Sequence, residues 1–115
     1  MTGYSGDDFY CDVAIPRREP LRVVFEDDAV LAFEHTRPFW PVHIVVVPKR
    51  HVDSLLTLEG DDTLAGSMLR AVQRVAADVL RDHGAASVTT NLGDYQDSKH
   101  LHVHVHAGTS RAERI

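Results

Sequence analysis

Histidine occupies every second position of one short run near the end of the chain: His100, His102, His104 and His106. The residues between and after them are apolar or small: Leu101, Val103, Val105 and Ala107. Because successive side chains of a β-strand point to opposite faces, the run predicts a strand with one imidazole face and one core face. Imidazole acts as a nucleophile, a proton carrier and a hydrogen-bond donor near neutral pH. The pattern therefore predicts that the imidazole face contains catalytic or ligand-binding side chains.

Length and composition narrow the class of protein. A chain of 115 residues can form a single core, and no repeat or linker-like segment divides it. Its formal net charge of -5 argues against binding a nucleic-acid polymer, whose phosphates need clustered Lys and Arg. Cys11 is the single cysteine, which excludes an intrachain disulfide. No segment has the length of a membrane span or the pattern of a signal peptide, so we expect a cytoplasmic protein with no membrane partner.

Hydrophobic periodicity predicts an α+β arrangement. Two β-prone runs, 21–25 and 29–34, flank an acidic turn and predict a hairpin. Residues 43–47 form a continuous β-branched run typical of a buried strand, and residues 87–92 predict another strand. A long helix is expected over residues 61–83. Its apolar stripe comprises Leu64, Met68, Val72, Val75, Ala76 and Val79. We expect the stripe to cover the apolar face of the histidine strand and to leave the imidazoles over an open cleft.

The alternating histidines, followed by a small-residue turn, resemble the histidine triad signature of the HIT superfamily of nucleotide hydrolases and transferases. Further blocks agree in the same order: Phe25-Glu-Asp-Asp28 with Leu31-Ala-Phe33, Pro41-Val-His43-Ile-Val-Val-Val-Pro48-Lys-Arg-His51, a long helix, then Asn91 and Gln96. The resemblance implies an α+β HIT-type fold with an antiparallel sheet of about five strands, one long helix and a short helix. It implies one domain over residues 1–115, with a core over residues 9–108 and short flexible termini.

The resemblance also implies a reaction. The chain is expected to cleave a phosphoramidate or phosphoanhydride bond at the α-phosphate of a nucleotide, as a hydrolase or a nucleotidyl transferase. His102 matches the nucleophile, which forms a covalent His102-nucleotidyl intermediate. The main-chain carbonyl of His100 matches the acceptor that fixes the tautomer of the nucleophile. No cofactor and no metal ion are part of this expectation. The expected partners are a purine nucleotide and a second copy of the chain, which meets the first through the long helix and a sheet edge.

Other site residues follow from the same resemblance. His104 and His43 match two further histidines of the catalytic site. Residues expected to contact the substrate, through phosphate or ribose, are Asn91, Gln96, Ser98 and His35. Main-chain N–H groups of the turn at residues 97 and 98 would also stabilise charge that develops on the phosphate oxygens.

The chain departs from the family pattern at several positions. In the Hint-like branch a serine that touches the phosphate stands where this chain has Asp97, unless the loop shifts to present Ser98. The family's ribose-binding aspartate is replaced by His35, which alters the expected ribose contact. The family has an apolar residue at the position of His106, which we expect at the rim or facing solvent. Trp40 is expected to pack at the entrance of the strand that contains His43.

Two other functions fit part of the pattern. Histidines two positions apart on a strand can ligate zinc, so a zinc-binding enzyme is one alternative. Alternate residues of a strand lie about 6.6 Å apart, which separates His100 from His104 by roughly 13 Å and argues against one shared ion. The second alternative is a sensor that binds a nucleotide without catalysis. Metal analysis separates the first alternative, and turnover of a nucleoside phosphoramidate separates the second.

Overall fold

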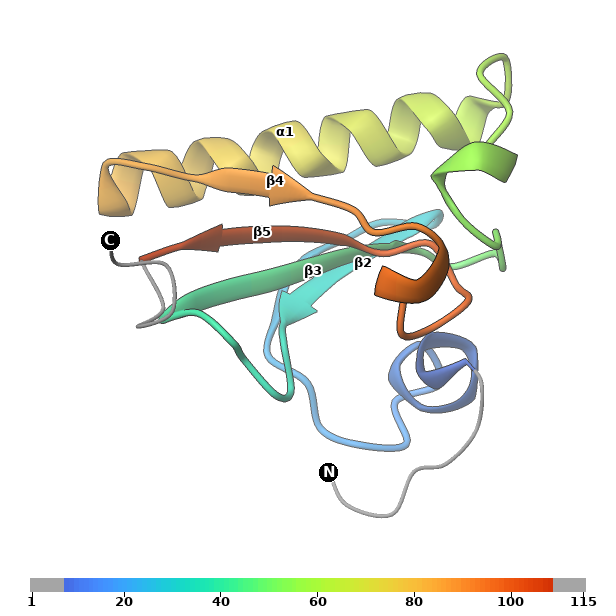
Figure 1. Cartoon of the computed structure of the whole chain (residues 1–115), viewed down its shortest axis with the longest axis horizontal. Coiled ribbons are helices and arrows are strands. Elements are labelled where there is room, and N and C mark those ends of the chain that lie inside the picture. Colours follow the sequence, from blue (N-terminus) through green and yellow to red (C-terminus); the bar gives the residue numbers. More distant parts are fainter. Residues whose placement is uncertain (1–7, 109–115) are drawn as a thin grey trace.

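A computed structural model describes residues 8–108 as a five-stranded antiparallel sheet with one long helix across it (Figure 1). The elements in chain order are η1 (Tyr10–Ala14), β1 (Val23–Glu26), β2 (Val30–Glu34), β3 (Val42–Pro48), η2 (Leu55–Thr57), α1 (Thr63–His83), β4 (Ser87–Thr89), η3 (Gly93–Tyr95) and β5 (Val103–Ala107). The strand order is β1-β2-β3-β5-β4. The predicted α+β class is confirmed. The predicted flexible termini lie outside the described residues.

The predicted hairpin is formed by β1 and β2, which pair antiparallel. Asp27 closes its turn, because its carboxylate accepts hydrogen bonds from the main-chain N–H groups of Ala29 and Val30, both at 2.8 Å. β3 lies in the middle of the sheet and pairs with β2 on one side and β5 on the other. This central place explains why its sequence is continuously apolar, since both faces of β3 are covered.

The long helix begins and ends close to the predicted limits. Oδ1 of Asp62 accepts from the N–H of Leu64 at 2.9 Å and caps the first turn. Gly84 ends the helix with a φ of 76°, a left-handed conformation that glycine adopts without a side-chain clash. The buried residues of α1 are Leu64, Met68, Ala71, Val75 and Val79. They pack on the side of the sheet that carries Leu101, Val103, Val105 and Ala107, as predicted. No described helix is long and apolar enough to cross a membrane.

The histidine strand is shorter than the sequence pattern suggests. β5 begins at Val103, so His100 and His102 precede the sheet ladder, and β4 likewise ends at Thr89. The N–H of Leu101 donates to the carbonyl of Val52 at 2.7 Å instead of pairing with a strand. The alternation of faces still holds through this segment, because the apolar residues face α1 and the imidazoles face the other way.

The imidazole face is not the open cleft that the sequence predicts. η1 crosses this face of the sheet (Figure 1), and its Tyr10 and Ala14 form a second core with side chains of β2 and β3. The residues of β2 and β3 in this core are Leu31, Phe33, Val45 and Val47. As a result His100 is 0% exposed and His102 is 5% exposed. The prediction was wrong because the apolar side chains of η1 cover a face that the alternation in residues 100–107 alone leaves open.

Candidate active site

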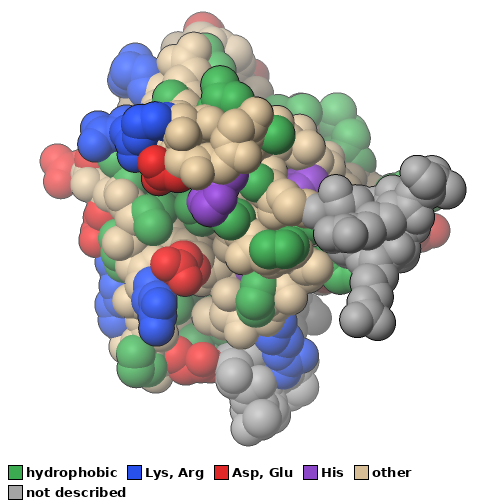
Figure 2. All heavy atoms as spheres, turned by 90° about the vertical axis from the view of Figure 1, so that its left-hand side faces the viewer, with side chains coloured by type: hydrophobic (Ala, Val, Ile, Leu, Met, Phe, Trp, Pro, Cys, Tyr) green, Lys and Arg blue, Asp and Glu red, His purple; other side chains and the backbone are tan. Residues whose placement is uncertain are grey.

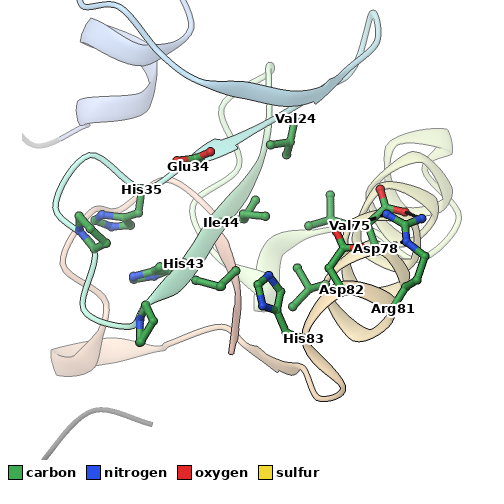
Figure 3. Close-up of a pocket in the computed structure, with 14 residues that line it drawn as sticks. Val24, Glu34, His35, His43, Ile44, Val75, Asp78, Arg81, Asp82 and His83 are labelled. Carbon is green, nitrogen blue, oxygen red and sulfur yellow. Dashed lines mark hydrogen bonds and ion pairs between the residues drawn. The ribbon is translucent and has the colours of Figure 1, made fainter. Parts of the chain in front are cut away.

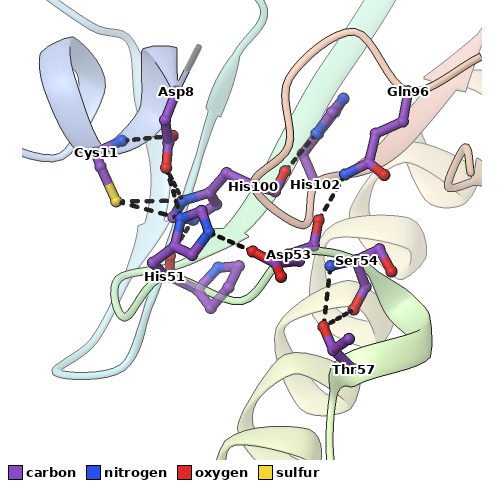
Figure 4. Close-up of polar contacts among 10 residues, drawn as sticks. Asp8, Cys11, His51, Asp53, Ser54, Thr57, Gln96, His100 and His102 are labelled. Carbon is purple, nitrogen blue, oxygen red and sulfur yellow. Dashed lines mark hydrogen bonds and ion pairs between the residues drawn. The ribbon is translucent and has the colours of Figure 1, made fainter. Parts of the chain in front are cut away.

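His102 is held in one tautomer by the main chain. Its Nδ1 lies 2.7 Å from the carbonyl oxygen of His100, so Nδ1–H donates and Nε2 keeps a lone pair (Figure 4). The carbonyl of His102 accepts from the hydroxyl of Thr90 at 2.9 Å. Burial lowers the pKa of His102, although the hydrogen bond to His100 opposes this shift. The neutral ring therefore presents an unprotonated nitrogen, as the resemblance implies for the nucleophile.

His43 and His104 form a chain of hydrogen bonds that fixes their protons. The N–H of Phe39 donates to Nδ1 of His43 at 3.0 Å, so the proton of a neutral His43 ring is on Nε2. This Nε2–H donates to Nδ1 of His104 at 2.8 Å. The proton of His104 is then on Nε2, where it can serve a ligand. Burial, followed by neighbouring imidazoles, lowers the pKa of His43 to about 3 and that of His104 to about 4.

The structure also brings His35 to this group. Its ring stacks on His43 with a centroid distance of 4.3 Å and lies 5.9 Å from the ring of His104. Nδ1 of His35 accepts from the N–H of Arg37 at 3.0 Å. Burial lowers the pKa of His35, and so does the nearby ring of His102. We call His35, His43 and His104 the imidazole cluster; its three rings are all held neutral at pH 7.

Three predicted substrate contacts lie in the loops before β5. Ser98 borders a cavity that His35 and Tyr10 also line, and its buried hydroxyl has no hydrogen-bond partner among the described residues. Nε2 of Gln96 donates to the carbonyl of Asp53 at 2.7 Å, which anchors the loop (Figure 4). Asn91 is half-buried and lies two positions after the last residue of β4. The contacts of Asn91 and Gln96 with phosphate stay predictions. Asp97 is exposed, and its charge only partly offsets the burial that lowers the pKa of His102.

His106 does not face solvent, so that prediction was wrong. The side chain is 8% exposed, because the ring of Trp40 stacks on it with a centroid distance of 3.6 Å and an interplanar angle of 11°. Trp40 thus packs at the entrance of β3, as expected. Nε2 of His106 lies 3.4 Å from the hydroxyl of Thr89 on β4. The large indole ring removes from solvent a position that the alternation alone leaves exposed.

A cavity of about 200 Å³ is lined by Phe9, Tyr10, Phe33, His35, Thr36, Arg37, Val45 and Ser98. His102 does not itself line the cavity and is one side chain away from it, because the ring of Tyr10 lies 5.0 Å from the ring of His102. Sequence reasoning missed Phe9, Tyr10, Thr36 and Arg37. Phe9 and Tyr10 could have been found, because apolar residues recur with helical spacing from Phe9 to Ala14.

A larger cavity, of about 410 Å³, lies at the end of the sheet against the last turns of α1. In Figure 3, the rings of His35 and His43 point away from Ile44 and from the helix. Both residues line the cavity, but their rings do not point toward the helix side of it. Figure 2, which looks at this end of the molecule, shows histidine among apolar and charged side chains. Arg81 is already paired with Asp78 and Asp82. The smaller cavity is therefore the better candidate for a substrate site.

A second group of ligand-type atoms surrounds the ring of His100: Asp8, Cys11, His51 and His100, here called the acidic cluster. Nε2 of His100 donates to the carbonyl of Pro48 at 2.8 Å, and its Nδ1 lies 3.0 Å from Asp8 and 3.3 Å from Sγ of Cys11. His51 lies between two carboxylates, 2.6 Å from Asp8 and 2.7 Å from Asp53 (Figure 4). This cluster was not predicted, because it brings together three segments that are distant in the chain, around positions 8–11, 51 and 100.

Both clusters have donors that metal ions use. In each, one ligand atom per residue lies within 4.8 Å of the others, and carboxylate, thiolate and imidazole are the ligands of zinc sites. His100 belongs to one cluster and His104 to the other, whereas His102 belongs to neither. The strand spacing likewise argues against one ion bound by both His100 and His104, which the structure places in different clusters.

Comparison with known proteins places this geometry in a family. Residues 17–111 match the HIT domain. An uncharacterized HIT-like protein of Synechococcus elongatus is 39% identical over 101 residues, which cover 85% of this chain and 89% of the relative. Protein HitA of Neisseria gonorrhoeae is 32% identical over 98 residues, which cover 84% of this chain and 91% of the relative.

Solved structures give the same result. A histidine triad protein from Clostridium difficile has a TM-score of 0.75 at 31% identity, covering 94% of this chain and 96% of that chain. A HIT family hydrolase from Legionella pneumophila has a TM-score of 0.76 at 26% identity, covering 90% of this chain and 94% of that chain. Sequence and structure agree, and the chain belongs to the HIT domain family.

Proposed function

We propose that the chain is a nucleotide hydrolase or nucleotidyl transferase that cleaves a phosphoramidate or phosphoanhydride bond at the α-phosphate. One observation carries the proposal: the 2.7 Å hydrogen bond from Nδ1 of His102 to the carbonyl of His100. It leaves the Nε2 lone pair of His102 for attack. A neutral imidazole suits an anionic phosphorus centre, because it brings no negative charge of its own. The names of structural relatives, which include HIT family hydrolases, support the reaction class.

The proposed reaction has two steps and one covalent intermediate. Nε2 of His102 attacks the α-phosphorus, a P–N bond forms, and the bond to the leaving group breaks. The leaving group keeps the electron pair and takes a proton from solvent. Water then attacks the phosphorus and gives a proton to solvent, and Nε2 recovers its lone pair as the nucleoside monophosphate departs. The carbonyl of His100 stabilises the positive charge that the ring carries between the steps.

Donors around His102 would bind the phosphate oxygens. His104 has its proton on Nε2, because Nδ1 accepts a hydrogen bond. The hydroxyl of Ser98 is buried without a partner among the described residues, and Asn91 and Gln96 complete the set that the family resemblance implies. Oriented neutral donors in a dry site stabilise developing charge without a metal ion or cofactor.

The nucleoside would occupy the cavity of about 200 Å³. Phe9, which is half-buried, offers aromatic surface on which a flat base can pack, and the buried rings of Tyr10 and Phe33 lie behind it in the cavity wall. A purine covers more of this surface than a pyrimidine, so the proposal includes a purine preference. From there the 5′ phosphate reaches His102, whose ring contacts that of Tyr10.

A homodimer in the cytoplasm is also part of the proposal. An exposed apolar surface lies between α1 and β4, where Leu69 is 59% exposed and Val88 is 51% exposed. β4 is an edge strand of the sheet, and such edges tend to be covered by another chain. The free thiol of Cys11 agrees with a reducing compartment. Light scattering of the wild type and of Leu69→Asp tests the dimer, which the aspartate should dissociate.

The test of the reaction is a panel of adenosine 5′-phosphoramidate, diadenosine polyphosphate and a nucleotide sugar, with products identified by mass spectrometry. We expect adenosine monophosphate from at least one of them and a transient adenylyl group on a peptide containing His102. The variant His83→Asn, which alters an exposed histidine at the end of α1, serves as the control. Nucleotide binding without any turnover would refute the enzyme and leave a sensor.

A further inference from the structure

The cavity of about 200 Å³ has an apolar part and a polar rim. Phe9, Tyr10, Phe33 and Val45 form the apolar part. His35, Thr36 and Arg37, which follow β2, form the rim. No described residue that lines the cavity carries a carboxylate, whereas the rim contributes an arginine, an imidazole and a hydroxyl. The rim is therefore suited to an anionic group and not to a cationic one.

His35 reverses the hydrogen-bonding character that an aspartate would have here. An ionised aspartate only accepts, and so it binds the hydroxyl protons of a ribose. Nδ1 of His35 already accepts from the N–H of Arg37 at 3.0 Å, which places the proton of the neutral ring on Nε2. His35 thus offers a donor, and its natural partner is an oxygen that only accepts. The oxygens of a phosphate monoester meet that requirement.

Arg37 adds a permanent charge at the same place. Arg37 lines the same cavity as His35, and its main-chain N–H donates to Nδ1 of His35 at 3.0 Å. A guanidinium binds phosphate through paired hydrogen bonds. In dinucleotide-binding proteins an acidic residue likewise binds the free ribose hydroxyl, whereas an arginine accommodates a phosphate on that oxygen. The rim of this cavity likewise has a guanidinium and an imidazole N–H, and no carboxylate among the described residues that line it.

We propose, building on the function proposed above, that the substrate is a nucleotide with a second phosphate on the 2′ or 3′ oxygen of its ribose. His35, Thr36 and Arg37 bind that phosphate, while the base packs in the apolar part and the 5′ phosphate meets His102. Asp97 opposes anions from outside the cavity, because it is exposed and does not line it. Its charge disfavours a bisphosphate more than a monophosphate, so a preference for the bisphosphate has to come from the rim residues.

Binding of the corresponding products tests this inference without requiring turnover. Isothermal titration calorimetry compares adenosine 5′-monophosphate with adenosine 2′,5′-bisphosphate and adenosine 3′,5′-bisphosphate. We expect one bisphosphate to bind at least about tenfold tighter than the monophosphate, which equals about 1.4 kcal/mol. Adenosine 5′-diphosphate controls for added charge away from the ribose and should gain less than about threefold. The preferred bisphosphate identifies the ribose oxygen.

Variants locate the contact. His35→Asp should abolish the preference for the bisphosphate, because a carboxylate repels the added phosphate. Arg37→Gln should reduce it to less than about threefold, and Arg70→Gln, which removes the same charge from an exposed position on α1, should preserve it. Equal binding of the monophosphate and both bisphosphates, or a preference that survives His35→Asp, overturns the inference.

Turnover is measured separately with adenosine 5′-phosphoramidate and its 2′- and 3′-phosphorylated forms. Hydrolysis with no gain from the second phosphate in either assay refutes the inference and leaves the proposed reaction standing. A bisphosphate preference in binding with no hydrolysis of any form refutes the proposed reaction and leaves the ribose-phosphate site standing.

Discussion

The imidazole cluster and the acidic cluster are built around histidines of the same alternating run, yet their surroundings are opposite. In the imidazole cluster, burial and neighbouring rings lower the pKa of His35, His43 and His104. In the acidic cluster, hydrogen bonds that the ring of His51 donates to the carboxylates of Asp53 and Asp8 raise the pKa of His51. Histidine spacing alone therefore does not decide charge, which depends on the partners that the fold brings in.

In the acidic cluster, the pKa values of Asp8 and Cys11 are also shifted. Burial alone would raise the pKa of Asp8, but hydrogen bonds from Cys11 and His100 outweigh it and lower the pKa to about 2. Burial and the carboxylate of Asp8 raise the pKa of the Cys11 thiol to about 11. The acidic cluster thus contains a carboxylate that hydrogen bonds keep ionised, whereas the imidazole cluster contains neutral rings. His102 lies between the clusters and takes its tautomer from the main chain.

The largest effect is expected at His102 itself. His102→Asn should lower kcat by at least ~10³-fold, because asparagine cannot form the covalent intermediate. The circular dichroism spectrum and the Tm should show a folded protein. A variant that retained a tenth of the wild-type rate would exclude His102 as the nucleophile.

Removing one ring from each cluster is the second test of the comparison. His43→Ala should lower kcat by about 10²-fold, because His104 loses the donor that keeps its proton on Nε2, and one misplaced donor in a preorganised site costs about this much. His51→Asn, in the acidic cluster, should leave kcat within about threefold. An equal loss of kcat in the two variants would contradict the assignment of catalysis to the imidazole cluster and not to the acidic cluster.

The third prediction concerns the stability of the folded protein at acidic pH. In the unfolded chain histidine titrates near 6.5, whereas the folded protein holds the pKa of His43 at about 3 and that of His104 at about 4. The unfolded state therefore binds more protons below pH 6.5, and the free energy of unfolding falls as the pH drops toward 4. The Tm of the wild type should decrease from pH 7 to pH 5, and that of His43→Asn should decrease less.

His51 should act with the opposite sign. Its folded pKa is raised, so its contribution to stability is complete below 6.5 and is lost as the pH rises through the folded value. His51→Asn should consequently lose more Tm between pH 7 and pH 5 than the wild type does. If the Tm of His43→Asn and that of His51→Asn both depend on pH as the wild-type Tm does, the opposite pKa shifts of the two clusters are refuted.

The smallest expected effect is that of chelation. Because His102 belongs to neither group of ligand-type residues, dialysis against EDTA should leave kcat unchanged. Metal content is measured by elemental analysis on the same samples. A rate that collapsed on chelation and returned with Zn²⁺ would support a metalloenzyme and refute the role given to His102.

Local patterns predicted most of the fold. The hairpin follows from its acidic turn at Asp27, and the limits of α1 follow from the capping residues Asp62 and Gly84. The alternation of residues 100–107 correctly separates the core face from the imidazole face. In each case the deciding contacts lie within a few residues along the chain, so the sequence contains them directly.

Contacts between distant segments account for what was missed. Asp8 and His100 are 92 positions apart, and their contact depends on where η1 crosses the sheet. The stacking of Trp40 on His106 likewise depends on the pairing of β3 with β5. The family resemblance gave His35 a place near the substrate, but only the structure shows its hydrogen bond from Arg37 and its stacking on His43.

The early end of the β5 ladder has a consequence for protein engineering. Since β5 begins only at Val103, the carbonyl of His100 is available to accept from the ring of His102. The hydroxyl of Thr90 likewise binds the carbonyl of His102, where a longer strand would offer a main-chain amide. A redesign that lengthened this strand to gain thermal stability would compete for the carbonyl that orients the ring. Regular secondary structure and reactivity are therefore alternatives at these positions, and a stabilised variant should be assayed before it is adopted.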